Sequence, residues 1–97
     1  MPAKSIHKDE YSVLLRRLRE LRTTAGMTQV DLSTALQRPQ SYVSDVERGS
    51  RRMDLLQLRE LCNACGSSLT DFVDEFEQEL DQVRPVRKPP KRPRPDK

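Results

Sequence analysis

Residues 28–49, TQVDLSTALQRPQSYVSDVERG, contain two short helical patterns with a proline between them. Pro39 fixes its own backbone and disfavours the α conformation at Arg38, so the first helix is expected to end at Gln37. Pro39 then suits the first turn of the next helix, where its missing N–H is not needed. The stretch therefore predicts helix, tight turn, helix, over residues 28–37 and 39–48. The apolar positions of the two helices are Val30, Leu32, Leu36, Val43 and Val46.

The second of these helices combines an apolar face with a short polar one. At about 100° per residue, Val43 and Val46 share the inward side, and Glu47 flanks them. The polar residues of the outward side are Ser41, Ser44, Asp45 and Arg48, with Gln40 at its edge. A short face that is rich in hydrogen-bonding groups suits contact with the edges of DNA bases better than burial in a core.

The same stretch resembles the Cro/phage-repressor (XRE-type) helix-turn-helix family. The matching positions are Thr28-Gln29, Leu32, Gln40-Ser41-Tyr42-Val43-Ser44 and Val46-Glu47-Arg48-Gly49, and the resemblance covers roughly Tyr11 to Phe76. It implies an all-α, compact, five-helix, lambda-repressor-like DNA-binding domain in which the 39–48 helix enters the major groove. One position departs from the family pattern. The turn usually carries a glycine, and here Gln37 or Arg38 takes that place.

Individual residues have expected roles in DNA contact, and the role of Gln29 as a phosphate contact is the one that the resemblance implies. Gln40 would bond adenine bidentately, Asp45 would accept from cytosine, and Ser41 and Ser44 would make short adaptable base contacts. The expected contacts to the DNA backbone come from Gln29, Arg38, Tyr42, Arg48, Arg51 and Arg52. A solvated basic loop is the alternative interpretation of the arginines from Arg48 to Arg52.

Arg22 and Glu47 are expected to form a structural ion pair. In the resemblance these two residues face each other across the junction of the first and third helices. A carboxylate on the inner flank of a helix is costly without a partner, and a bidentate arginine satisfies it. The pair is expected to fix helix orientation more than to add net stability.

The remaining helices follow from apolar spacing and capping signals. They are expected over residues 9–25, 54–65 and 68–82, so that residues 9–83 form one domain behind a flexible segment 1–8. The apolar positions of the last two helices include Leu55, Leu58, Leu61, Leu69, Phe72 and Val73. Arg16, Arg17 and Arg19 lie mainly off the apolar stripe of the first helix. They form a solvated face, or one or two of them contact phosphates.

The last helix is acidic and carries a heptad-like apolar seam. Six Asp or Glu and no Lys or Arg lie between Leu69 and Val83. Phe76, Leu80 and Val83 continue the seam beyond the reach of a compact five-helix unit. A second copy of the chain is the simplest partner for them, which predicts a homodimer. Fraying of the helix end is the alternative.

Residues 84–97, RPVRKPPKRPRPDK, predict a disordered basic tail. Five prolines and seven Lys or Arg leave no apolar residues for a core beyond one valine. Such a tail adds sequence-independent affinity for DNA, or it serves only solubility. The acidic helix or the tail could also bind a protein partner.

Several classes of protein are disfavoured by composition. Of the 97 residues, 34% are hydrophobic, and the sequence has no run of about 18 apolar residues and no apolar leader. These features predict a cytoplasmic protein without membrane contact, associated with a bacterial or phage nucleoid. Cys62 and Cys65 fall at core spacing, and no second Cys/His pair completes four metal ligands. His7 stands alone in the N-terminal segment. We therefore expect no metal, no cofactor and no catalytic activity.

The sequence thus predicts a sequence-specific regulator that binds double-stranded DNA. The alternative is an antitoxin-like or adaptor module that keeps the helix-turn-helix frame but binds a protein. The DNA sequence that it reads, the genes it controls and the sign of its effect do not follow from these residues.

Overall fold

The computed structural model describes residues 6–83, and the side chains of residues 10–82. This part of the chain is all-α, as predicted, and it contains five helices and no strand. Residues 1–5 of the predicted flexible segment 1–8, and the whole of the predicted tail 84–97, lie outside the described residues. The helices are α1 (Ile6–Thr24), α2 (Gln29–Ala35), α3 (Ser41–Arg48), α4 (Leu55–Ala64) and α5 (Leu69–Val83).

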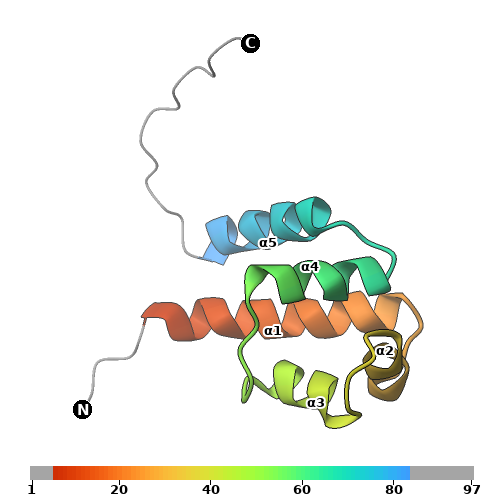
Figure 1. Cartoon of the computed structure of the whole chain (residues 1–97). Coiled ribbons are helices and arrows are strands. Elements are labelled where there is room, and N and C mark those ends of the chain that lie inside the picture. The colour runs from red at the N-terminus through yellow and green to blue at the C-terminus, as the bar shows by residue number, and fades with distance from the viewer. Residues whose placement is uncertain (1–5, 84–97) are drawn as a thin grey trace.

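Helix α1 is the longest element, and the other helices are arranged around it (Figure 1). In this view α2 and α3 lie on one side of α1, and α4 and α5 lie on the other. Contacts of α1 with α3 and with α5 join the two sides, and α2 also contacts α4. The buried apolar core takes at least one side chain from each helix: Leu18, Leu32, Tyr42, Val43, Val46, Leu61, Cys62 and Phe72.

Local capping fixes where three of the helices begin. Thr28 and Asp31 exchange side-chain and backbone hydrogen bonds at the start of α2, and Asp54 and Gln57 do the same for α4. The Ser68 hydroxyl accepts the Asp71 N–H at the start of α5. Each of these bonds satisfies an N–H that the first helical turn leaves without a partner. No helix among residues 6–83 is long and apolar enough to cross a membrane.

Two helix starts differ from the sequence prediction by more than one residue. Helix α1 begins at Ile6 rather than at residue 9, so residues 6–8 are helical. Helix α3 begins at Ser41 rather than at Pro39. The Pro39 carbonyl accepts the Tyr42 N–H at 2.9 Å, which closes a four-residue turn, Pro39 to Tyr42, that leads into the helix. Because α2 already ends at Ala35, the chain needs these extra residues to reverse direction before α3 starts.

Three apolar residues that the spacing placed on inward faces are exposed. Val30, Leu55 and Val73 are 46%, 66% and 37% exposed. Val30 is two residues from the buried Leu32, and a two-residue step turns a helix by about 200°, so the two side chains point in nearly opposite directions. Leu55 is the first residue of α4, and on α5 the core position is filled by Phe72, which is buried.

Gln37 takes the place of the glycine that is usual in this turn. Its φ of 57° makes it the one residue among those described, glycines apart, in the left-handed region. There the Cβ of an L-residue crowds the carbonyl oxygen, at a cost of about 1–2 kcal/mol. The turn that joins α2 to α3 is therefore strained at a known position.

Gln37→Gly is expected to raise the free energy of unfolding by about 1 kcal/mol, because glycine adopts this conformation without a clash. Thermal denaturation followed by circular dichroism measures the change. Gln37→Ala is the control, since alanine keeps the Cβ and should bring no gain. A glycine variant that melts at or below the wild-type temperature would contradict the assignment of strain to Gln37.

Candidate nucleic-acid interface

Helix α3 is divided between core and surface. Tyr42, Val43, Val46 and Glu47 are buried, while Gln40, Ser41 and Arg48 are exposed. Ser44 and Asp45 lie between these extremes. The residues that the sequence predicted to read bases therefore share the outward side of one short helix.

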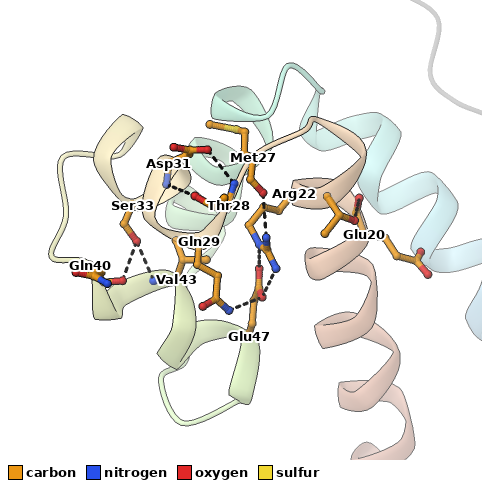
Figure 2. A network of polar contacts seen from close by, with 11 residues as sticks. Glu20, Arg22, Met27, Thr28, Gln29, Asp31, Ser33, Gln40, Val43 and Glu47 are labelled. Atoms are coloured by element: carbon orange, nitrogen blue, oxygen red, sulfur yellow. Dashed lines mark hydrogen bonds and ion pairs between the residues drawn. The ribbon is translucent and has the colours of Figure 1, made fainter.

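The Ser33 hydroxyl fixes the start of α3 from the neighbouring helix. Ser33 is 1% exposed, donates to the Gln40 carbonyl at 3.2 Å and accepts the Val43 N–H at 3.3 Å (Figure 2). Gln40, at the N-cap position, makes no side-chain capping bond of its own. Ser33 thus replaces the N-cap side chain of α3, because its hydroxyl accepts an N–H of the first turn, and it fixes the distance between α2 and Gln40. Sequence reasoning missed this residue, because a buried serine has no periodic signature.

A buried carboxylate holds α1, α2 and α3 together. Both Glu47 oxygens accept from Arg22, Oε2 from Nε at 2.6 Å and Oε1 from Nη2 at 3.0 Å. The Gln29 amide nitrogen adds a third bond to Oε1 at 3.0 Å (Figure 2). The Glu47 side chain is 4% exposed and that of Arg22 is 11% exposed. A buried charge with three donors is satisfied, so the junction is held in one geometry.

Arg22 also ties this junction to the loop before α2. Its Nη1 donates to the Met27 carbonyl at 2.9 Å. The hydrogen bond to Glu47 raises the pKa of the Arg22 guanidinium, although burial acts in the opposite direction. The Arg22 guanidinium therefore keeps its charge at any pH at which the fold exists. Gln29, predicted to contact phosphate, uses one of its two amide hydrogens here and keeps the other.

Arg48 is paired with two of the predicted base-reading residues. Its Nη2 lies 2.6 Å from Asp45 Oδ1, and its Nη1 donates to the Ser44 hydroxyl at 3.1 Å. The guanidinium therefore offsets the charge that Asp45 would otherwise present to DNA phosphates. Neither Asp45 nor Arg48 was expected to have this partner.

Tyr42 lies under arginines instead of reaching outward itself. It is 5% exposed, and the guanidinium carbons of Arg38 and Arg51 lie 5.0 and 5.5 Å from its ring centroid. Arg52 lies 5.2 Å from the ring of Tyr11 on α1 in the same way. An aromatic face attracts a guanidinium, so these rings hold three cations beside α3. Arg38 has a second partner in Glu60, at 3.3 Å.

An open depression lies between the starts of α2 and α3. It is lined by Gln29, Val30, Gln40, Ser41 and Ser44. Four of these residues had predicted roles in DNA contact. Val30 did not, because the sequence was interpreted as placing it inside.

The remaining candidate residues lie away from α3. Arg17 bonds Glu75 at 3.2 Å and Glu79 at 2.9 Å, and Arg16 is also paired with Glu79. These arginines of α1 therefore face the acidic helix α5. The ion pairs with α5 were not expected, although Arg16 and Arg19 are exposed, as they would be on a solvated face.

The predicted dimer seam is only partly covered within one chain. Phe76 and Leu80 are half-buried, and the Phe76 ring stacks on Phe72 with centroids 6.4 Å apart. Val83 is the last residue of α5, and its side chain lies outside the described residues.

The two cysteines are free thiols at the end of α4. Cys62 is buried, and Cys65 is half-buried. Burial raises the pKa of the Cys62 thiol to about 11, and it also raises that of Cys65. Both remain protonated near neutral pH and are poor nucleophiles and metal ligands in that form. No group of three or more potential metal ligands occurs among residues 6–83.

Four helices packed around α1, one of them a short helix with a polar outward side that its neighbours hold at the surface, define a helix-turn-helix protein. The helix-turn-helix domain family matches residues 13–74. The HTH-type transcriptional regulator DdrOP3 of Deinococcus deserti is 36% identical over 70 residues, which are 72% of this chain and 54% of that protein. The chain thus spans about half the length of this relative.

Two solved structures show the same fold. An XRE-family like protein from Pseudomonas syringae pv. tomato has a TM-score of 0.72 at 36% identity, and the match covers 76% of this chain and 90% of that one. A single-residue mutant of the restriction-modification controller protein C.Esp1396I has a TM-score of 0.68 at 25% identity, with coverage of 75% and 97%. The chain belongs to the XRE-type helix-turn-helix family.

Glu47→Ala is expected to lower the free energy of unfolding by about 3 kcal/mol, because it leaves Arg22 largely buried without its carboxylate. Urea denaturation at neutral pH measures the loss. Glu60→Ala is the matched control, since its pair with Arg38 is largely exposed and contributes less than about 1 kcal/mol. An unchanged stability of Glu47→Ala would remove the structural role of this pair.

Proposed function

We propose that this protein is a sequence-specific regulator of transcription that binds double-stranded DNA, with the N-terminal half of α3 in the major groove. The observation that carries the proposal is the outward side of α3. It presents Gln40, Ser41 and Ser44 next to one another, on a helix whose other side is locked to α1 and α2. Base readout needs hydrogen-bonding groups that are held at fixed positions. The outward side of α3 supplies the groups, and the contacts with α1 and α2 fix their positions.

Direct base contacts are assigned to the start of α3. Gln40 is exposed and can bond adenine N6 and N7 together, and the hydroxyls of Ser41 and Ser44 can donate or accept. Asp45 can accept a hydrogen bond from cytosine only when its ion pair with Arg48 is broken. A phosphate within reach of Arg48 would draw the guanidinium away from Asp45 and free the carboxylate for this contact.

Contacts to the DNA backbone are assigned to the cations around this face. Arg38 and Arg51 rest against Tyr42, and Arg52 rests against Tyr11, so part of the entropy of ordering their side chains is lost before DNA binds. Gln29 donates its remaining amide hydrogen to a phosphate. Tyr42 acts through the arginines that it supports.

We further propose that the protein binds as a homodimer through α5. The half-buried Phe76 and Leu80 form an apolar strip on α5, and the heptad-like spacing of the sequence continues to Val83. A two-fold axis along this strip would cover it with the same strip of a second copy. Two α3 helices would then read half-sites about one helical turn apart.

Gln40→Ala is expected to weaken binding to the preferred DNA by about 1–3 kcal/mol, because one bidentate base contact is lost. The measurement is selection of fragments from genomic DNA, followed by titration of one selected fragment at two salt concentrations. Gln78→Ala on α5 is the matched control and should bind as the wild type does. Arg51→Gln should instead weaken all fragments alike and flatten the salt dependence.

The proposal of specific readout fails if Gln40→Ala and Ser41→Ala leave fragment selection intact while removal of residues 84–97 abolishes binding. That outcome would assign DNA binding to the basic tail. Failure to select any fragment, together with capture of a protein by α5, would favour the adaptor alternative.

Leu80→Asp is expected to halve the mass of the protein in solution, because a charge in the strip prevents its burial against a second copy. Light scattering coupled to size exclusion measures the mass. Gln82→Asp adds the same charge to an exposed position about 200° away on α5 and should leave the mass unchanged. If wild type and Leu80→Asp have the same mass, the dimer model is wrong.

A further inference from the structure

Val30 is an exposed valine at the interface proposed for DNA. It is the second residue of α2 and 46% exposed, whereas Leu32 on the opposite side is fully buried. A single exposed apolar residue is common on protein surfaces and means little alone. The exposure of Val30 becomes informative because this side chain lines the depression between α2 and α3.

The depression combines one apolar wall with four polar ones. Gln29, Gln40, Ser41 and Ser44 supply amides and hydroxyls, and Val30 supplies two methyl groups. Hydrogen-bonding groups alone would suit a phosphate or a water layer. A valine among them suits a ligand that presents a small apolar group beside hydrogen-bonding atoms.

The position of Val30 relative to Gln40 is fixed before any ligand binds. Ser33, three residues further along α2, bonds the Gln40 carbonyl and the Val43 N–H. Gln29, the neighbour of Val30, is bonded to Glu47 at 3.0 Å. Two side chains of α2 therefore join it to α3, and Val30 cannot move far from Gln40 while these bonds hold.

The major groove of DNA offers a small apolar group beside hydrogen-bonding atoms at one kind of base. Thymine carries a C5-methyl group there, next to its O4 acceptor. The C5-methyl projects into the groove, toward any protein wall that faces the neighbouring bases. No other standard base edge matches an isopropyl group in this way.

We propose that Val30 is a specificity residue that reads the methyl group of a thymine beside the base contacted by Gln40. This inference rests on the proposed function and extends its reading surface from α3 to the start of α2. Val30 packs against the methyl group while Gln40, Ser41 and Ser44 bond the adjacent polar edges. Part of the sequence selection then comes from a helix that otherwise contacts only the DNA backbone.

The test replaces each thymine of a selected fragment by deoxyuridine, one at a time, which removes only the C5-methyl group. With wild-type protein, one replacement in each half-site is expected to weaken binding about fourfold, the contribution of one buried methyl group. Val30→Ala is expected to bind the unmodified fragment about fourfold more weakly and to lose its response to that replacement. Val73→Ala, the same change at an exposed position of α5, serves as the control and should keep the full response.

Two results would overturn the role of Val30 and leave the proposed function intact. One is that no replacement weakens binding while Gln40→Ala still abolishes selection. The other is that Val30→Ala keeps the wild-type response to deoxyuridine, or weakens all fragments equally, as a contact to sugar or phosphate would. If the wild type selects no fragment at all, the proposed function fails, and this inference fails with it.

Discussion

The geometry of the interface depends on the burial of one carboxylate. Glu47 sits on the inner flank of α3, almost out of contact with water, and an unpaired charge there would be strongly destabilising. Arg22 at the end of α1 and Gln29 at the start of α2 supply three hydrogen bonds to it. Since a carboxylate in that position is satisfied only when both helices are in place, the orientation of α3 is tied to theirs. Replacing this pair by apolar residues could conserve stability, but it would remove the requirement for a single orientation.

Specificity and affinity are supplied by different residues. The exposed start of α3 has no positive charge, and Arg48 at its end is occupied by Asp45 and Ser44. Three other arginines lie beside this face and contact aromatic rings: Arg38 and Arg51 contact Tyr42, and Arg52 contacts Tyr11. Such an arrangement separates a neutral reading surface from the arginines proposed to bind phosphates. In the proposed function, salt should weaken the phosphate contacts strongly and the base contacts little.

Much of the fold followed from the sequence because its signals are local. The capping residues Thr28 and Asp54 were recognisable from their spacing to Asp31 and Gln57. The Arg22–Glu47 pair came from family resemblance, not from spacing. Partners set by tertiary packing were not predictable: Ser33 with the start of α3, Arg17 with α5, and the two arginines on Tyr42. The exposure of Val30 was available from helical geometry, since it stands about 200° from Leu32. It was missed because apolar character was taken to mean burial.

The strained turn and the extra reading position have a common physical origin. Helix α2 has only seven residues, so its buried side is filled by Leu32 and Ser33, and Leu36 follows half-buried at its end. The chain must then reverse at once, which forces Gln37 into the left-handed region and delays α3 until Ser41. Because α2 is so short, its start remains close to the start of α3, and residues of both line the same depression. Side chains on the exposed face of α2, such as Val30, therefore lie next to Gln40. In the proposed complex, the shortness of α2 is what gives a second helix access to the bases.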